Sequence, residues 1–487
     1  MGVKPDKISY SAAISACEKG GQWQLALSLL STMPEIRVMP DEISYNAAIS
    51  ACEKSARWQL ALSILSTMPY VRVMPNETSH SAAISACEKG GEWQLALGLL
   101  KIMHKMSLFQ NQISHNAAIS ACEKAGQWQM ALGLLSTITG VRFTPDQISI
   151  NAAISACEKG GQWQLALSLL HVMPQMMLLP NKISFTAAIS ACEKGGQWQL
   201  ALSLLHIMSH MRVMPNAISY SAAISSCEKG GQWQLALSLL HIMSHMRVMP
   251  NEISYNAAIS ACSKGGHWQM ALSLLSTMPD VRLMQDEISY NAVMCVCVKA
   301  GQWQLALNLL NTMFDMGVMP DDISCNTAIS ACEKTGRWQL ALSLLRCMPD
   351  MRVMPDDISC NAAISAFEKG GQWQLALCLL SAMPDMRVMP DEVSCNAAIS
   401  AFEKGGQWQR ALSLLSAMPG MRLMPTQISC SAAISACEKG GQRHMALSLL
   451  STMPDNCAQL LKDSFHPRQP GKNNEVNKQR SIIAAIY

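Results

Sequence analysis

The chain has 487 residues, a formal net charge of +3 and an apolar fraction of 49%. A charge this close to zero does not by itself announce a nucleic-acid binder, and no apolar run approaches the ~20 residues that a membrane-crossing helix needs. The nineteen cysteines include no CxxC pair, which argues against a zinc site and against a thioredoxin-like motif. We therefore expect a soluble protein with no metal, no cofactor and no membrane contact.

The sequence repeats with a period of 35 residues, without insertions, from residue 7 to residue 461. A fixed period in this range indicates a solenoid. Residues 1–6 read as the end of a preceding repeat, and no transit peptide is visible. The thirteen units, whose positions are numbered 1 to 35, begin at Lys7, Glu42, Glu77, Gln112, Gln147, Lys182, Ala217, Glu252, Glu287, Asp322, Asp357, Glu392 and Gln427.

Each unit is expected to form two helices. Positions 3–13, as in SYNAAISACEK, are rich in small and apolar residues, with Ser at position 3 as the expected N-cap and Gly at 14 and 15 ending the helix. Positions 16–27, as in QWQLALSLLSTM, place apolar residues at helical spacing. One such hairpin cannot bury its own apolar faces, so we expect an all-α array in which neighbouring units share a core.

Two positions are occupied almost uniformly and are expected to serve packing. All twelve tryptophans stand at position 17, where the last unit has Arg443. Eleven cysteines stand at position 11, where Phe367 and Phe402 substitute in two units. A position that accepts Cys or Phe packs rather than ligates. The Trp ladder, surrounded by Leu and Ala, is expected to be core rather than a stacking platform for bases.

Two polar positions vary among a few residue types. Position 5 is Asn in eight units, Ser in four and Thr in one, and position 35 is Asp in six units and Asn in five. One interpretation of position 35 is a turn or cap residue, a role that Asn and Asp fill about equally well. The other interpretation is base recognition, because Asp only accepts hydrogen bonds whereas the Asn amide also donates. Positions 2 and 5 share one helix face, with position 35 near the helix start.

The repeat resembles the pentatricopeptide repeat (PPR) pattern in its 35-residue period, early Tyr-Asn, Lys before the Gly turn, Ala-Leu in the second helix and terminal Pro-Asp. The resemblance covers roughly residues 1–461. It implies a right-handed α-solenoid superhelix of P-type repeats that binds single-stranded RNA, one base per repeat, and that is not an enzyme. The family works in RNA processing, stability or translation, so a chloroplast or mitochondrion is the expected location.

The resemblance also implies roles for individual positions. Positions 5 and 35 select the base, and these residues are Ser11, Asp41, Asn46, Asn76, Ser81, Asn111, Asn116, Asp146, Asn151, Asn181, Thr186, Asn216, Ser221, Asn251, Asn256, Asp286, Asn291, Asp321, Asn326, Asp356, Asn361, Asp391, Asn396 and Thr426. Position 2 wedges between neighbouring bases, and these residues are Ile8, Ile43, Ile113, Ile148, Ile183, Ile218, Ile253, Ile288, Ile323, Ile358 and Val393.

The Lys at position 13 is implied to lie near the phosphates. These residues are Lys19, Lys54, Lys89, Lys124, Lys159, Lys194, Lys229, Lys264, Lys299, Lys334, Lys369, Lys404 and Lys439. The alternative role for this Lys is compensation of the helix-end dipole. Glu at position 12 accompanies it in eleven units and partly cancels its field.

The family's pairing rules imply a target strand. Ser or Thr with Asn implies A, Ser with Asp implies G, Asn with Asp implies U, and Asn with Asn implies a pyrimidine, Y. The pair Asn396 and Thr426 is weakly assigned to a pyrimidine, and Ser431 has no proper partner because Leu461 follows a degraded linker. In the family's parallel polarity the target is 5'-GYAUYAAUUUUY-3'.

The end of the chain departs from the repeat. Residues 455–487 are polar and mildly basic, so we expect a disordered tail that overlaps the degraded last linker. This tail is too short for a deaminase-like or nuclease-like domain, and the H-x-E signature of zinc deaminases does not occur in the sequence. Two alternatives remain open: a protein-binding scaffold of the tetratricopeptide type, whose unit has about 34 residues, and an expanded repeat array without a specific ligand.

Overall fold

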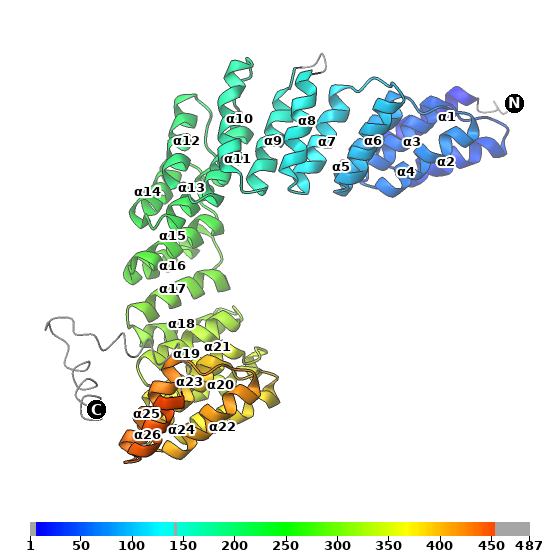
Figure 1. Ribbon diagram of the computed structural model, residues 1–487. Coiled ribbons are helices and arrows are strands. Elements are labelled where there is room, and N and C mark those ends of the chain that lie inside the picture. Colours follow the sequence, from blue (N-terminus) through cyan, green and yellow to red (C-terminus); the bar gives the residue numbers. More distant parts are fainter. Residues whose placement is uncertain (1–5, 141–143, 453–487) are drawn as a thin grey trace. The chain divides into compact units, whose positions relative to one another are not determined.

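The computed structural model describes residues 6–140 and 144–452. Within these residues all regular structure is helical, with 26 α-helices, five 3₁₀ helices and no strand. Consecutive helices pair into hairpins, one for each 35-residue unit (Figure 1), which confirms the predicted all-α solenoid. The contacts divide the chain into two units, residues 1–261 and 262–487, and each is described by itself. The predicted tail and Leu461 lie outside the described residues.

The first unit contains seven complete hairpins. Their first helices are α1 (Lys7–Lys19), α3 (Glu42–Lys54), α5 (Glu77–Gly90), α7 (Gln112–Lys124), α9 (Gln147–Lys159), α11 (Lys182–Lys194) and α13 (Ala217–Lys229). Their second helices are α2 (Trp23–Glu35), α4 (Trp58–Thr67), α6 (Trp93–Lys105), α8 (Trp128–Gly140), α10 (Trp163–Gln175), α12 (Trp198–His210) and α14 (Trp233–His245). The 3₁₀ helix η1 (Met68–Val71) follows α4.

The division between the units falls within α15 (Glu252–Gly265). In the second unit the first helices are α17 (Glu287–Lys299), α19 (Asp322–Lys334), α21 (Asp357–Lys369), α23 (Glu392–Lys404) and α25 (Gln427–Lys439). The second helices are α16 (Trp268–Thr277), α18 (Trp303–Asp315), α20 (Trp338–Cys347), α22 (Trp373–Ala382), α24 (Trp408–Ala417) and α26 (Arg443–Thr452). The 3₁₀ helices are η2 (Pro279–Val281), η3 (Pro349–Met351), η4 (Pro384–Met386) and η5 (Met418–Met421).

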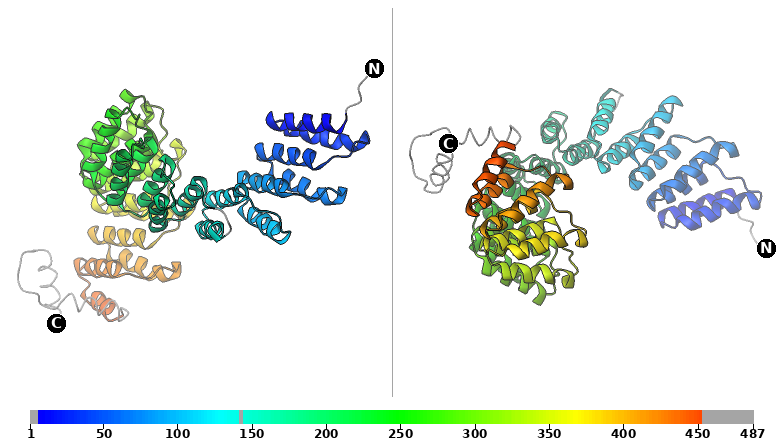
Figure 2. Two further views of the ribbon diagram at one scale, coloured as in Figure 1. Left: turned by 90° about the horizontal axis from the view of Figure 1, so that it is seen from above. Right: turned by 60° about the horizontal axis from the view of Figure 1, so that its bottom comes forward.

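Neighbouring hairpins stack in the same way within each unit. A first helix such as α3 packs on its own second helix, α4, on the first helices of both neighbouring repeats and on the second helix of the preceding repeat. The successive hairpins therefore lie side by side, as the further views also show (Figure 2). This stacking brings the same position of consecutive repeats next to each other, so one residue type at one position forms a row.

Each first helix begins at position 1, two residues before the predicted start. Residue 35 of the preceding repeat is its N-cap: Asp41 Oδ1 accepts the backbone N–H of Ser44 at 3.0 Å, and Ser44 Oγ accepts the backbone N–H of Asp41 at 3.3 Å. This reciprocal arrangement is a capping box. The prediction that Ser at position 3 is the N-cap is therefore wrong, because this serine lies inside the helix and completes the cap. The second helices begin at position 17, one residue later than predicted.

The two glycines that end the first helix serve different purposes. Gly196, at position 15, has φ of +67°, in the left-handed region that favours glycine. Gly195, at position 14, has φ of −80°, which any residue adopts. A Cβ at Gly195 would lie 2.3 Å from Cδ1 of Trp163 in the preceding repeat, so a side chain here requires the indole to shift. The half-buried Trp of one repeat therefore packs directly on the backbone of the next.

The same close approach recurs in both units. The other pairs are Gly90 with Trp58, Gly160 with Trp128, Gly230 with Trp198, Gly370 with Trp338, Gly405 with Trp373 and Gly440 with Trp408. The tryptophans thus pack where two repeats meet, at the margin of the core. Where position 14 is Ser or Thr, an Arg two residues later covers the ring: Arg57 lies 5.2 Å from the Trp23 centroid and Arg337 lies 5.0 Å from the Trp303 centroid.

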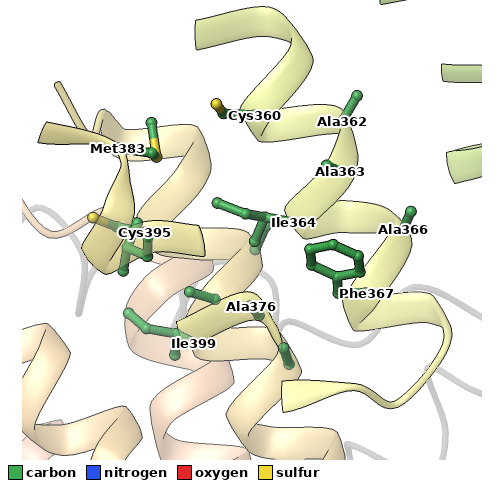
Figure 3. Packing of buried hydrophobic residues seen from close by; sticks show 14 of the residues in the cluster. Cys360, Ala362, Ala363, Ile364, Ala366, Phe367, Ala376, Met383, Cys395 and Ile399 are labelled. Carbon is green, nitrogen blue, oxygen red and sulfur yellow. The ribbon is translucent and has the colours of Figure 1, made fainter. Parts of the chain in front are cut away.

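Side chains from adjacent repeats form the shared core. In the second unit, Ile364 and Phe367 of α21 lie against Ala376 of α22 and Ile399 of α23, and all four are buried (Figure 3). The cysteines at position 11 are free and buried, and burial raises the pKa of Cys192 to about 11. The prediction that position 11 packs rather than ligates is confirmed, since Phe367 fills the same place. No helix in the described ranges is long and apolar enough to cross a membrane.

Candidate nucleic-acid interface

The two variable polar positions lie in contact. In nine repeats the side chain at position 5 donates a hydrogen bond to the side chain at position 35, over 2.9–3.4 Å. The pairs are Asn46–Asn76, Ser81–Asn111, Asn116–Asp146, Asn151–Asn181, Ser221–Asn251, Asn291–Asp321, Asn326–Asp356, Asn361–Asp391 and Asn396–Thr426. The prediction from helical spacing that position 5 lies close to position 35 is confirmed in these repeats.

Three predicted pairs differ from this arrangement or lack a described contact. Ser11 reaches Asp41 through Ser44, whose Oγ lies 3.1 Å from Ser11 Oγ and donates to Asp41 Oδ1 at 2.6 Å. The buried hydroxyl of Thr186, whose predicted partner Asn216 caps α13, makes no hydrogen bond among the described residues. In the remaining pair, Asn256 lies in α15 and Asp286 caps α17.

In three repeats the aspartate at position 35 divides its two oxygens between two roles, whereas Asp321 Oδ1 accepts both hydrogen bonds. Asp356 Oδ1 accepts the backbone N–H of Ser359 at 2.8 Å, which caps the helix. Asp356 Oδ2 accepts the amide Nδ2–H of Asn326 at 2.9 Å. The cap fixes the carboxylate, and the position-5 amide then fixes its second oxygen.

An asparagine at position 35 caps the helix in the same way. Asn76 Oδ1 accepts the backbone N–H of Ser79 at 2.9 Å and also the Nδ2–H of Asn46 at 3.3 Å. The Asn76 Nδ2 group takes no part in the cap. Between Asp356 and Asn76 the capping oxygen is the same, the position-5 hydrogen bond moves onto that oxygen, and the second atom changes from an acceptor to a donor. The cap interpretation of position 35 is confirmed, and it is compatible with a second role for the same side chain.

Burial ranks the two positions. Six residues at position 5 are buried, with exposed fractions of 4–8%: Ser11, Ser81, Asn151, Ser221, Asn291 and Asn326. The other six predicted residues at position 5 are half-buried, as are all twelve at position 35. The Oδ1 atoms of Asn151 and Asn326 are buried without a hydrogen-bond partner among the described residues. Position 5 is therefore the more buried of the two positions in six repeats, and the two positions are both half-buried in the other six.

Two of the carboxylates at position 35, those of Asp321 and Asp41, have surroundings that favour the ionised form. Burial alone would raise the pKa of Asp321, but hydrogen bonds from Ser324 and Asn291 outweigh it, and the pKa lies below its usual value. The pKa of Asp41 is likewise lowered, because the hydrogen bonds from Ser44 and the ion pair with Lys7 outweigh burial. Both side chains are therefore pure hydrogen-bond acceptors at neutral pH.

The aliphatic side chains at position 2 are exposed throughout. Their exposed fractions run from 56% at Val393 to 76% at Ile8. They lie in the first turn of each first helix, three residues before position 5 and on the same face. Ile428, at 63%, belongs to this row, although it was not among the predicted residues; its place in the 35-residue period is the signal that identifies it.

The Lys at position 13 ends each first helix, apart from the one-residue extensions of α5 and α15. In nine repeats its Nζ forms an ion pair of 2.9–3.2 Å with the Glu at position 12 of the preceding repeat, as in Lys194 with Glu158. These half-exposed pairs contribute only about 0–1 kcal/mol each. The charge-compensation role thus takes the form of an inter-repeat ladder, and contact with phosphate stays a prediction.

The ladder has a gap in the second unit. Position 12 is Ser263 before Lys299 and Val298 before Lys334, so these two lysines meet no ladder carboxylate. Lys334 Nζ instead lies 3.4 Å from the backbone oxygen of Val298. These are the two position-13 lysines whose preceding repeat supplies no Glu at position 12.

Comparison with protein families identifies the repeat throughout most of the chain. Profiles described as PPR repeat match residues 43–70, 78–108, 113–139, 148–177, 253–282, 323–353, 358–388 and 393–423. The pentatricopeptide repeat domain profile matches residues 1–55, 168–229 and 203–267, and the PPR repeat family profile matches residues 285–332. No curated protein matches the sequence at a significant level.

Solved structures share the fold at low sequence identity. The pentatricopeptide repeat protein PPR10 from maize matches with a TM-score of 0.61 and 19% identity, over 95% of this chain and 75% of that chain. PPR10 in complex with an 18-nt PSAJ RNA element matches with a TM-score of 0.51 and 17% identity, over 96% of this chain and 81% of that chain. With family profiles covering more than half of the sequence, the chain belongs to the pentatricopeptide repeat family.

Proposed function

We propose that the protein binds single-stranded RNA sequence-specifically, with one base per repeat, in chloroplast or mitochondrial RNA processing, stability or translation. The observation that carries this proposal is the direct contact between positions 5 and 35 in nine repeats, in eight of which position 2 is an exposed aliphatic side chain. The RNA-bound form of PPR10, which shares the fold, supports the choice of ligand.

In this proposal each base lies between the position-2 side chains of two consecutive repeats. Exposed Ile side chains such as Ile323 and Ile358, at 57% each, offer apolar surface to the faces of a base. The edge of the base then meets the accessible atom at position 35. The buried position-5 side chain acts as a positioning residue, because it bonds to position 35 and fixes which atom points outward.

The donor or acceptor at position 35 decides between bases. Uracil and guanine carry a ring N–H, which the carboxylate of Asp356 or Asp391 can accept. Cytosine and adenine carry a bare ring nitrogen, to which the amide of Asn251 can donate. A mismatched base leaves a partly buried polar group unpaired, at a cost of about 1–3 kcal/mol. The residue at position 5 then separates purines from pyrimidines as the family rules imply, which gives 5'-GYAUYAAUUUUY-3'.

Phosphate contact by the position-13 lysines requires them to leave their ladder partners. The proposal therefore places the strongest phosphate contacts at Lys299 and Lys334, which face no ladder Glu. Binding should weaken steeply as salt rises, since phosphate contacts release counterions.

Selection from a random pool of single-stranded RNA tests the proposal. We expect enrichment of a U-rich strand that matches 5'-GYAUYAAUUUUY-3', with tighter binding to it than to a scrambled strand of the same composition. Equal affinity for the two strands would refute base-specific reading. An absence of any shift at low salt would refute RNA binding and favour a protein-binding scaffold or an array without a specific ligand.

A further inference from the structure

Two neighbouring repeats carry the same pair of exposed histidines at the end of the second helix. His206 and His210 lie in α12, and His241 and His245 lie in α14, each within the sequence HIMSH. The Nε2 atoms are 2.8 Å apart in the first pair and 3.3 Å apart in the second. None of the base-reading or core positions described above includes these side chains.

We propose that each pair is a two-ligand site for a divalent transition-metal ion. A metal–imidazole bond is about 2.0–2.1 Å long, so two nitrogens on one ion at 90° to 109° lie about 2.8–3.4 Å apart. The observed separations of 2.8 and 3.3 Å match this range. The atoms that approach each other are Nε2 in all four rings, and the four-residue spacing places both rings on one helix face.

The donor set selects the class of ion. Neutral imidazole suits Zn²⁺, Ni²⁺ and Cu²⁺, whereas Mg²⁺ and Ca²⁺ prefer oxygen ligands. Among the residues that the structure describes, no three or more His, Cys, Asp or Glu side chains gather to hold one ion. Each site therefore supplies two protein ligands and leaves the other positions to water, as in an exchangeable rather than a closed structural site.

The preceding repeat provides a natural control. His171 in α10 occupies the place of His206, but Gln175 stands four residues later. This helix therefore offers one imidazole where α12 and α14 offer two. A single imidazole holds an ion much more weakly than a pair, so α10 is not expected to bind.

The sites stand next to the chain reversals that lead to two base-reading residues. His210 and His245 are the last residues of α12 and α14. Arg212 follows with φ of +56°, and the chain reaches Asn216, the N-cap of α13, four residues later. A bound ion would join two adjacent helical turns and hold the last turn before this reversal.

Titration of the full chain with NiCl₂, followed by calorimetry, tests the proposal. The alternative is that the short Nε2–Nε2 distance reflects only a hydrogen bond between the two rings. We expect His210→Gln, which reproduces the pair in α10, to bind one Ni²⁺ fewer than the unchanged chain. The double variant His210→Gln with His245→Gln should bind two fewer, and His171→Gln should bind as many as the unchanged chain. Circular dichroism confirms that these exposed substitutions leave the fold intact.

Electron paramagnetic resonance with Cu²⁺ adds an independent measurement. Two imidazole nitrogens should couple to the ion in the unchanged chain, and this signal should be lost in the double variant. Equal Ni²⁺ uptake by the double variant and the unchanged chain would overturn the proposal, as would Mg²⁺ competing for the same sites.

Discussion

The contact between Trp163 and Gly195 predicts that Gly195→Ala destabilises the array. The added Cβ would lie 2.3 Å from Cδ1, 2.8 Å from Cγ and 3.0 Å from Nε1 of the indole, well inside van der Waals contact. Overpacking of this kind costs about 1–3 kcal/mol. The backbone at Gly195, with φ of −80°, suits alanine, so the substitution regains about 0.4–1 kcal/mol from the unfolded state. The net loss should be about 1–2 kcal/mol.

Alanine at position 14 of another repeat helps to estimate the cost of adding a methyl group there. Ala125 stands at position 14 beside the preceding Trp93, which shows that a junction can adapt to one methyl group. The cost at Gly195 should therefore stay below the upper end of the overpacking range, in keeping with a net loss of about 1–2 kcal/mol. Gly196→Ala is the matched control, because nothing lies within 4 Å of its Cβ and only its φ of +67° opposes the change.

Urea unfolding together with amide hydrogen exchange measures the effect. A repeat array need not unfold in one step, so exchange at the junction of α10 and α11 should report the loss locally. Combining Gly195→Ala with Trp163→Leu should recover part of the lost stability, whereas Gly196→Ala with Trp163→Leu should show no such coupling. A Gly195→Ala variant as stable as the unchanged chain would refute the account of position 14.

Three further predictions concern the interface and the core. Asn251→Asp should move the base preferred by its repeat from A toward G, as RNA selection would show. The melting temperature should stay unchanged, because the capping oxygen that accepts Ser254 N–H is retained. An unchanged base preference would contradict the prediction. Val298→Glu should give Lys334 the Glu partner found in other repeats and weaken RNA binding about two- to fivefold. Gel shift measures this, and an unchanged affinity would count against phosphate contact by Lys334. Iodoacetamide at pH 8 should modify the exposed Cys347 but not the buried Cys192. Burial raises the pKa of the Cys192 thiol to about 11, so roughly one-thousandth of it is ionised at this pH. Mass spectrometry of the labelled chain measures the modification, and equal labelling of the two cysteines would contradict the burial of Cys192.

The period and the apolar stripes were sufficient to predict the hairpins and the packing role of position 11. The helix start was misplaced because Ser and Asp are both good caps, and only the backbone shows that Asp41 flanks the helix while Ser44 lies within it. The Lys–Glu ladder was not predicted as a set of pairs, because it joins residues 36 apart in sequence, as in Lys194 and Glu158, and depends on how neighbouring repeats are staggered. The sequence likewise does not distinguish the roles of the two glycines at positions 14 and 15, of which the first leaves space for an indole and the second adopts a positive φ.

The contact of positions 5 and 35 was anticipated from helical spacing, but its atomic division was not. The sequence shows that Asp and Asn alternate, and it cannot show that one oxygen is already committed to the helix. That assignment needs the hydrogen bonds of a repeat such as Asn326 with Asp356. The burial of position 5, which makes it a positioning residue in the proposed reading, is also a property of the stacked array alone.

The shared capping oxygen separates two properties that mutations usually change together. Asp and Asn hold the helix start through the same kind of atom, so replacing one by the other alters the second polar atom of the side chain without removing the helix cap. Under the proposed reading, such an array can change its base preference through single substitutions at position 35, and no intermediate along that route has to be a weaker fold.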